Sequence, residues 1–380
     1  MVDKIFYIGG STSNQRGAVG THTSGIISGL KHNNVFVTGV FFDNALPTES
    51  CNENILIHRP KRWPGPLRKI AERLAIIFAA AKVPSDALIY HRFDPLLTPF
   101  IVRSNMIVEY NDDVLAQIKF AADKGNWSRV GRIARMFFYP RIFRLSEKIT
   151  FRRARLVVCV TESLCDFVRN IEPQAHAAFV PNGSDAVFDS DLVSRDCREA
   201  SPIHIAHVGT LTHWDGLMEL LAGLVILRRD HGDVKFRLSI IGDGDLKSSL
   251  VSCVSEFGLG DVVSFHASIS HVEAIKFLHD VDVVPLLKKI TSYGLSPMKF
   301  YEALSLGCYL VCTDVPHINE ISSDEGVIVG LPLDPVEIAS AIRFAYEKKD
   351  ELRANRLQRA ADFQVSNSWT ERVRRILEKI

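Results

Sequence analysis

The sequence has no apolar run long enough to cross a lipid bilayer. Its longest uninterrupted apolar run, residues 74–81, has eight residues, whereas a membrane-spanning helix needs about 20. Residues 1–8 lead straight into a strand-like run, without the basic segment, apolar core and cleavage site of a signal peptide. We therefore expect a cytoplasmic protein.

The sequence also lacks the patterns of a metal site or a disulfide framework. Its 7 cysteines are scattered, without CxxC pairs or zinc-type spacing, which predicts reduced thiols. Asp112 and Asp113 have the position of a helix cap, and Asp280 and Asp282 flank the start of a buried strand. Neither pair has the converging ligands that a divalent ion needs, so we expect a protein that works without a metal. No Ser/His/Asp or Cys/His set of a nucleophilic enzyme stands out either.

Length and charge indicate two domains of different character. At 380 residues the chain exceeds one typical domain, and 47% hydrophobic with 23% charged residues fits a globular protein with a large core. Residues 1–190 contain 24 Lys and Arg against 17 Asp and Glu, a net charge of +7. The remaining residues contain 21 against 27, a net charge of −6. This asymmetry indicates that the two halves face different partners.

Both halves open with a strand, a glycine-containing loop and a helix. In the first half these are residues 4–8, 9–20 and 21–30, and the pattern begins again at residue 203. Short apolar runs then alternate with helical periodicity, which predicts an α/β fold with one doubly wound parallel sheet in each half. Ligands bind beyond the carboxyl ends of parallel strands, so we expect one site in a cleft between the domains. The other predicted strands are 35–41, 87–90, 106–110, 156–160, 178–180, 203–208, 236–241, 262–265, 281–285, 309–312 and 326–329.

The segment 292–307 carries the clearest chemical pattern. Ser296 is a good N-cap, and Pro297 suits the first helical position. Lys299 lies in the first turn, where the helix dipole favours a carboxylate over a cation. A bound diphosphate would explain it, because free amides, the dipole and Lys299 would hold an anion together. Glu302, one turn later, would then accept hydrogen bonds from a ribose. Alternatively, Lys299 and Glu302 form only a solvated pair, worth about 0.2–0.5 kcal/mol.

The order of several motifs resembles a known family. The run 294–307 and the residues after it, 311–316 and 319–321, are similar to the donor-site helix and next strand of glycosyltransferase family 4 (glycosyl transferases group 1). These are retaining enzymes of the GT-B fold, which has two Rossmann-like domains and an interdomain cleft. Further segments follow in the family's order, so the resemblance spans nearly the whole chain: 17–20, 90–92, 109–111, 180–185, 208–211, 241–244 and 280–285.

The resemblance implies a domain organisation and an activity. It implies an acceptor-binding domain (1–190), a nucleotide-sugar-binding domain (191–362) and a C-terminal segment (363–380) whose helix starts at Trp369 and crosses back to the first domain. The implied reaction moves a hexosyl-type sugar from a UDP- or GDP-sugar to a glycan or lipid-linked acceptor, with retention and without a metal or other cofactor. Such enzymes build surface polysaccharides or glycolipids. The expected partners are the donor and the acceptor, and no nucleic acid.

The resemblance also assigns roles to single residues. Lys299, Glu302, His91 and Arg92 would act in catalysis, although His91 has an alternative place in the core, with Arg92 toward the ligand. The acceptor would contact His22, Asn111 and Asp112, unless His22 is only a helix-start residue. The donor would be bound by Gly17, Gly20, Gly209, Thr210, Ala267, Ser268, Gly294, Leu295, Ser296, Lys299 and Glu302.

The chain departs from the family at two places. The family commonly has a second glutamate eight residues before the ribose-binding one, where this chain has Gly294. It often has an Arg and a Lys in the loop that here spans 210–216 without either, which places more of the diphosphate charge on Lys299 and Arg92. Two other functions therefore stay open: a nucleotide-sugar-binding protein without turnover, and a GT-B epimerase or hydrolase of nucleotide sugars.

Two basic amphipathic segments predict contact with an anionic membrane. In residues 59–78 the cations Arg68, Lys69 and Arg73 lie opposite an apolar stripe. Residues 129–155 contain nine Lys and Arg against one acidic residue, together with aromatic side chains. Such helices suit the headgroup region of a bilayer, so we expect peripheral attachment to the inner face of the cell membrane. Alternatively, both helices cover the sheet of the first domain and their cations are only solvated.

Overall fold

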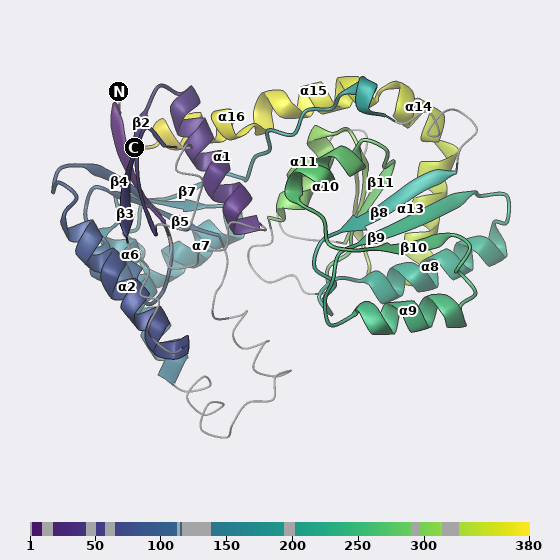
Figure 1. The fold of residues 1–380 in the computed structure, drawn as a ribbon, viewed down its shortest axis with the longest axis horizontal. Coiled ribbons are helices and arrows are strands. Elements are labelled where there is room, and N and C mark those ends of the chain that lie inside the picture. The colour runs from purple at the N-terminus through teal and green to yellow at the C-terminus, as the bar shows by residue number, and fades with distance from the viewer. Residues whose placement is uncertain are drawn as a thin grey trace. The chain divides into compact units, whose positions relative to one another are not determined.

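The chain divides into two compact units, each with one parallel sheet (Figure 1). The first comprises Met1–Asn182, Ser292–Ser296 and Trp369–Ile380, and the second comprises Gly183–Thr291 and Pro297–Ser368. The structure is a computed structural model. It describes residues 2–9, 18–42, 51–57, 65–111, 115, 138–193, 202–289, 296–313 and 327–380, leaving out the side chains of 18, 19, 54, 56, 65, 66 and 327–331.

The first unit has a seven-stranded sheet in the order β3-β2-β1-β4-β5-β6-β7, and every neighbouring pair is parallel. All the strands predicted for this half are present, and β3 is an addition at the edge. The strands are β1 (Lys4–Ile8), β2 (Phe36–Phe42), β3 (Glu53–Ile57), β4 (Leu88–Arg92), β5 (Met106–Tyr110), β6 (Leu156–Cys159) and β7 (Ala177–Phe179).

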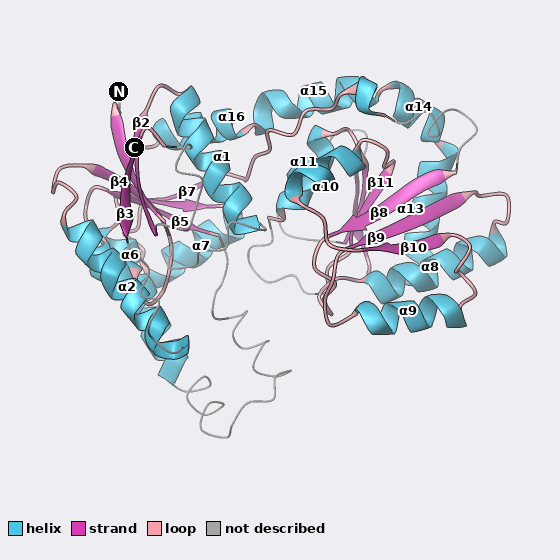
Figure 2. Ribbon diagram, viewed as in Figure 1, coloured by secondary structure: helices cyan, strands magenta, loops and turns pink. Residues whose placement is uncertain are grey.

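The described helices of the first unit are α1 (Ala18–His32), α2 (Gly65–Ala81), α3 (Thr98–Ile101), α6 (Tyr139–Arg153), α7 (Glu162–Ile171) and α16 (Trp369–Leu377). α1 packs along α16 (Figure 2), where Asn33 Nδ2 donates a hydrogen bond of 2.9 Å to the Thr370 carbonyl. α3 packs against both α2 and α6. α6 and α7 cover β5, β6 and β7 through Phe151, Leu164 and Val168. The C-terminal helix is therefore an integral part of the first unit.

The second unit has a six-stranded parallel sheet in the order β10-β9-β8-β11-β12-β13. Its strands are β8 (Ile203–Val208), β9 (Phe236–Ile241), β10 (Val263–His266), β11 (Val283–Leu286), β12 (Tyr309–Thr313) and β13 (Val327–Leu331). Its helices are α8 (Leu217–Asp230), α9 (Lys247–Glu256), α10 (His271–Leu278), α11 (Met298–Ser305), α13 (Pro335–Glu347), α14 (Lys349–Ala354) and α15 (Arg356–Asn367). The predicted α/β fold with one parallel sheet in each half is confirmed.

The core of the second unit lies between this sheet and the helices α8, α9 and α13. Leu220 and Leu224 of α8, spaced for one helix face, are fully buried against Ile338 of α13 and the strands. α13 begins at a strong cap, because the Asp334 side chain accepts hydrogen bonds from the first helical amides and Pro335 follows it. α10 and α11 lie on the other face of the sheet (Figure 1). The packed sheet thus gives a firm base to the loops at its carboxyl edge.

The described residues bear on two expectations from composition, the absence of a membrane-spanning helix and the state of the cysteines. Within them, no helix combines the length and apolar content needed to cross a membrane. The six cysteines in this part of the chain are free, and five of them are buried. Burial raises the pKa of the Cys312 thiol well above its usual range. A buried thiol of this kind is chemically inert, so these cysteines serve packing.

Candidate active site

The loop after β8 lies at the ligand-binding edge of the second sheet. The strand order reverses between β8 and β11, which are neighbours, and doubly wound sheets bind ligands at this point. The Gly216 amide donates a hydrogen bond of 2.6 Å to the Leu287 carbonyl. The Lys289 amide donates one of 2.9 Å to the Trp214 carbonyl. These bonds hold the loop 209–216 against the segment that follows β11.

Lys299, the second residue of α11, lies against Gly209, the first residue after β8. Gly209 has a φ of +142°, which L side chains rarely adopt. A Cβ on this residue would overlap the Lys299 Nζ and lie 2.7 Å from its Cε. Glycine at this position therefore leaves the room that the ammonium group occupies. Burial and the neighbouring Lys288 lower the pKa of Lys299 to about 8, so the group is still charged at neutral pH.

An ion pair of Lys288 with Asp215, and the neutral ring of His207, lie beside Lys299. Lys288 Nζ forms an ion pair with Asp215 Oδ1, and Thr212 Oγ1 donates a hydrogen bond of 2.8 Å to Asp215 Oδ2. Burial would raise the pKa of Asp215, but Lys288 outweighs this effect and lowers it. Burial and Lys299 lower the pKa of His207 to about 3, so its ring is neutral. In the described part of the chain, its Nε2 has no hydrogen-bond partner.

Glu302, one turn after Lys299, is held by His271, the first residue of α10. His271 Nε2 lies 2.8 Å from Glu302 Oε1, and the Glu302 side chain is 12% exposed. The hydrogen bond with Glu302 raises the pKa of His271. A capping box fixes the start of α10, because the Ser270 side chain accepts from the Glu273 amide and the Glu273 carboxylate accepts from the Ser270 amide. The position of His271, and through it that of Glu302, follows from this cap.

The start of α11 differs from the prediction by one residue. The helix begins at Met298, and Pro297 is its cap residue, with a φ of −66° and extended ψ. Ser296, the predicted cap, precedes it and instead accepts a hydrogen bond of 2.9 Å at its carbonyl from Asn182 Nδ2 within the first unit. The first turn of α11 has no acidic residue. Its free amides and the helix dipole therefore favour an anion from outside the helix.

These groups together have the chemistry of a diphosphate site. The two carboxylates nearest to Lys299 are already engaged, Asp215 by Lys288 and Glu302 by His271. The Lys299 ammonium is therefore left to neutralise a ligand, together with the amides of the first turn of α11. The site combines a cation, a helix N-terminus and, one turn later, a carboxylate that can accept hydroxyl groups.

The other residues predicted to bind the donor have varied positions. Thr210 is exposed next to Gly209, and Ala267 and Ser268 are exposed in the loop that leads into α10. Gly20 is the third residue of α1 and not a loop residue, because that helix begins three residues earlier than predicted. Gly17, Gly294 and Leu295 lie outside the described residues, as does Asp112, which was predicted to contact the acceptor.

His91 has the alternative position that the sequence left open, inside the core of the first unit. It is fully buried at the end of β4. Its Nδ1–H donates a hydrogen bond of 2.9 Å to the Ile8 carbonyl, and its Nε2 lies 3.1 Å from Thr98 Oγ1. Burial lowers its pKa. With both ring nitrogens engaged, His91 has no atom left for a ligand, so the catalytic role predicted for it is not supported. Arg92, the next residue, is partly exposed.

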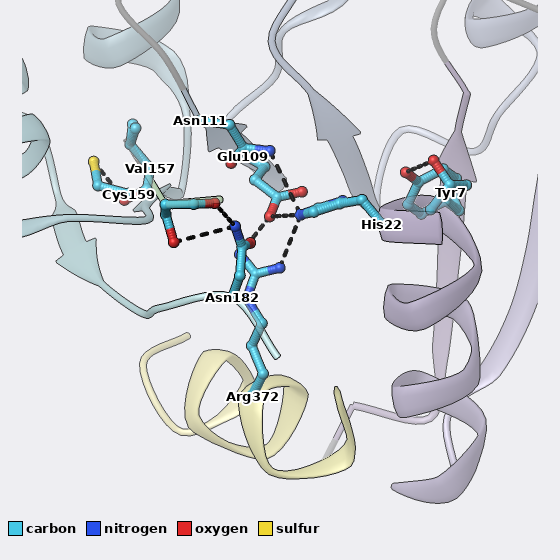
Figure 3. Close-up of polar contacts among 10 residues, drawn as sticks. Tyr7, His22, Glu109, Asn111, Val157, Cys159, Asn182 and Arg372 are labelled. Carbon is cyan, nitrogen blue, oxygen red and sulfur yellow. Dashed lines mark hydrogen bonds and ion pairs between the residues drawn. The ribbon is translucent and has the colours of Figure 1, made fainter. Parts of the chain in front are cut away.

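His22 belongs to a buried polar cluster in the first unit (Figure 3). Its Nε2 lies 2.9 Å from Glu109 Oε1 and 3.0 Å from Arg372 Nη1 of α16, and Arg372 also donates to Glu109. Asn111, after β5, contributes Nδ2 at 3.5 Å from the same ring nitrogen. Burial would raise the pKa of Glu109, but His22 and Arg372 hold it well below its usual range.

This cluster fastens α16 to α1 and β5. Trp369 packs edge-on against the His22 ring, with 5.1 Å between the ring centroids. Burial lowers the pKa of His22, so the charged pair is Glu109 with Arg372. The ring is buried against α16, which supports the alternative of a helix-start residue without a ligand, and contact with an acceptor stays a prediction. His22 is the fifth residue of α1 and has a structural role.

The carboxylate pair after α10 is also structural. Arg353 donates two hydrogen bonds of 2.8 Å to Asp282, whose Oδ2 accepts a third from the His204 amide. The Asp280 carbonyl accepts from His204 Nδ1 at 2.7 Å. Among the residues that the structure describes, no group of three His, Cys, Asp or Glu has the arrangement of a metal site. Independence of a metal stays a prediction.

The residues that surround Lys299 and Glu302 were not predicted. Lys288 is the second residue after β11, and the carboxyl ends of parallel strands are where ligand residues are expected, so its position in the sequence contained a usable signal. His271 follows Ser270 in an S-x-x-E capping pattern, which marks a helix start close to the predicted 267–268 loop. His207 had no such signal, because it lies inside a strand.

Three similar proteins show the relationships of the chain. Residues 202–348 match the family model described as glycosyl transferases group 1. The glycogen synthase of Mycobacterium tuberculosis is 27% identical over 189 residues, which are 49% of this chain and 43% of that protein. The amylovoran biosynthesis glycosyltransferase AmsK of Erwinia amylovora is 24% identical over 295 residues, 68% of each chain. The structure of HepE from Anabaena in complex with UDP-glucose has a TM-score of 0.70 at 14% identity, covering 99% of this chain and 100% of that one.

The family match and the structural likeness cover different parts of the chain. The family model falls on the second unit, on β8 to α13, which holds Gly209, Lys299 and Glu302. The match to glycogen synthase spans less than half of that protein. The likeness in fold extends over both units. Residues 202–348 therefore resemble the glycosyl transferases group 1, and the chain has the GT-B fold.

Proposed function

We propose that this protein is a retaining glycosyltransferase of family 4. It transfers a hexosyl-type sugar from a UDP- or GDP-sugar to a glycan or lipid-linked acceptor in the synthesis of a surface polysaccharide or glycolipid. The named activities of the relatives support polymer synthesis, since one is a glycogen synthase and another acts in amylovoran biosynthesis. The complex of HepE with UDP-glucose supports a nucleotide sugar as donor.

One observation carries the proposal, the Lys299 ammonium beside Gly209 at the N-terminus of α11. This cation is charged at neutral pH, and the nearest carboxylates are bound to other groups. A diphosphate at this point would accept hydrogen bonds from the ammonium and from the first amides of the helix. A solvated pair of Lys299 with Glu302 would not need a glycine with positive φ to admit the lysine, so the structure favours the anion site.

Glu302 extends the site from the diphosphate to the nucleoside. It lies three residues after Lys299, a rise of about 4.5 Å along the helix. A ribose attached to the bound diphosphate would donate its hydroxyl groups to this carboxylate. His271 holds Oε1 of Glu302 and leaves the second oxygen for the sugar. The exposed loop residues Ala267 and Ser268, close in sequence to His271, are placed to contact the base.

The residues of this site would act by positioning and by stabilising charge. Departure of the sugar leaves negative charge on the diphosphate, and Lys299 with the α11 amides stabilises that charge. The departing diphosphate itself accepts the proton of the acceptor hydroxyl on the same face of the sugar, which gives retention. No protein nucleophile and no metal enter this scheme.

A ligand panel followed by a turnover assay tests the proposal. The thermal unfolding of the full chain is measured with UDP, GDP and ADP, since a ligand at 100 times its Kd stabilises a protein by about 2.7 kcal/mol. We expect UDP or GDP to raise the midpoint and ADP to have a smaller effect. The matching nucleotide sugar is then incubated with the protein, and release of the diphosphate is measured with and without glycan or lipid-linked acceptors. Binding without release would support the nucleotide-sugar-binding alternative, and the absence of any shift would refute a nucleotide site.

A further inference from the structure

An exposed apolar face covers three helices of the first unit. Its members are Ile70, Leu74 and Phe78 on α2, Phe100 on α3, and Ile142 and Leu145 on α6, with exposures from 48% to 70%. α3 packs against both α2 and α6, so it connects the two helices that bear the other members of the face. Large exposed hydrophobic residues in the described part of the second unit are scattered over many elements by contrast.

The apolar stripe of α2 points away from the sheet. Ile70, Leu74 and Phe78 follow one another at intervals of four residues, which places them on one side of the helix. The side that faces the sheet is formed by Ile76 and Ala80, which are 1% and 2% exposed. The helix therefore covers the sheet through Ile76 and Ala80, as in the alternative that the sequence left open, while its apolar stripe is exposed.

The exposed charges of α2 and α6 are all positive. Each helix has one acidic residue, Glu72 and Glu147, and both are buried. Glu147 accepts hydrogen bonds of 2.8 Å from the Tyr110 hydroxyl and from Arg144. On α6 the exposed cations Arg141 and Lys148 flank the apolar residues of the face. The exposed charges on α2 and α6 therefore all have the sign that an anionic surface attracts.

We propose that the apolar face is the docking surface for an anionic lipid bilayer. The apolar side chains enter the boundary between headgroups and acyl chains, and the exposed cations beside them on α6, Arg141 and Lys148, contact anionic headgroups. α2 is 17 residues long, about 25 Å, so it presents an extended stripe that lies in the plane of the interface. The excess of positive charge in residues 1–190 agrees with this choice. The inference goes beyond the proposed transferase activity and does not depend on it.

Vesicle co-sedimentation of the full chain tests the docking surface. Vesicles of phosphatidylcholine with one third phosphatidylglycerol are compared with vesicles of phosphatidylcholine alone, at increasing concentrations of NaCl. We expect binding to the anionic vesicles that weakens with salt, because the Debye length falls to about 10 Å at 0.1 M. Equal recovery from both kinds of vesicle at low salt, or no binding to either, would overturn the proposal.

Two double variants separate the apolar and the electrostatic contributions. Arg141→Gln with Lys148→Gln should lower the partition coefficient on anionic vesicles roughly thirtyfold, because each cation contributes about 1 kcal/mol. Phe78→Ser with Phe100→Ser should lower it at least about tenfold. All four side chains are exposed, and thermal unfolding checks that each variant folds.

Matched controls lie in the second unit. Lys235→Gln removes an exposed cation, and Val365→Ser removes a side chain that is 77% exposed. Both controls should stay within about twofold of the original protein. If the controls lose as much binding as the double variants, the face has no special role. If the Phe78 and Phe100 variant changes the molecular mass in light scattering but sediments with vesicles like the original, the face joins two copies of the chain instead.

Discussion

Replacing Lys299 by methionine should stabilise the fold and weaken nucleotide binding. The pKa of Lys299 is about 8, against 10.5 as its ordinary value. Each pH unit between these two values corresponds to about 1.36 kcal/mol. Without screening by solvent, the charged ammonium would therefore lower the free energy of unfolding by about 3 kcal/mol. The side chain is partly exposed, and solvent screening reduces the effect, so we expect a gain of about 1–2 kcal/mol in the free energy of unfolding at pH 7.

The pH dependence of this gain has a definite sign. Between pH 8 and 10.5 the folded protein binds fewer protons at Lys299 than the unfolded chain does, so the stability of the original protein rises with pH over this window. The methionine variant has no such group. The difference in stability between the two proteins should therefore be full below pH 8 and disappear toward pH 10.5.

The same substitution that stabilises the fold should weaken nucleotide binding. A hydrogen bond from a charged donor contributes about 1.5–3 kcal/mol, so Lys299→Met should raise the Kd of the nucleoside diphosphate roughly 10- to 150-fold. Urea unfolding at pH 7 and pH 10 gives the stability, and titration calorimetry gives the Kd. Lys235→Met, at an exposed lysine just before β9, should change neither quantity. A Lys299 variant that is less stable than the original and binds the nucleotide equally well would refute the anion-site reasoning.

Three further predictions concern the second unit. Glu302→Gln should fold normally and bind the nucleotide roughly 10- to 100-fold more weakly in calorimetry, because an amide replaces the charged acceptor of the ribose hydroxyls; unchanged affinity would contradict that role. Transferase activity should survive excess EDTA, since Arg353 already engages Asp282, and a loss that Mg²⁺ restores would show a metal requirement. The buried rings of His204 and His207 have pKa values of about 4 and about 3 in the folded protein. As the pH falls, the unfolded chain therefore protonates these rings before the folded protein does. The free energy of unfolding should thus fall between pH 7 and pH 5, by about 2 kcal/mol for each ring, and urea midpoints that do not change would count against burial of neutral imidazoles.

The strands were predicted well because a parallel sheet buries both of its faces. Such strands consist of continuous apolar runs, and runs like Ile203–Val208 or Tyr309–Thr313 are visible without any knowledge of their neighbours. β3 was missed because it is an edge strand that begins with Glu53 and Asn54. Polar residues are acceptable there, since only one side of the strand pairs, with β2. Its existence depends on that neighbour and not on its own composition.

Lys299 and Glu302 could be predicted as the centre of the candidate site because Lys299 breaks a local rule of helix composition. A lysine in the first turn of a helix opposes the helix dipole, and this conflict is visible in eight residues of sequence. The groups around Lys299 could not be found in the same way. His207 lies in β8, Asp215 in the loop after it and Lys288 shortly after β11. These two strands are far apart in the sequence and become neighbours only through the sheet order. Sequence periodicity gives the strands, but it does not give that order.

For two histidines of the first unit, His22 and His91, the sequence suggested a role at a ligand that the structure does not support. Motif position placed His91 at a strand end and His22 at a helix start, and both positions often carry ligand contacts. What decides their role is the partner that reaches them. Arg372 lies 350 residues after His22 in the chain, and Thr98 reaches His91 from the next helix. Burial of a polar side chain depends on such distant partners, so it could not be deduced from the local pattern.

The loop after β8 lacks the two cations that the family often has there, and this determines which positive charge the candidate site offers. The loop 209–216 has Asp215 and no cation where the family often has an arginine and a lysine. In the structure Asp215 is paired with Lys288, which comes from the other side of the strand reversal, so the two charges cancel. His207 is neutral. The net positive charge that this part of the site offers therefore rests on Lys299 and on the helix dipole of α11. A diphosphate that gained a second cation from this group would have to draw Lys288 away from Asp215.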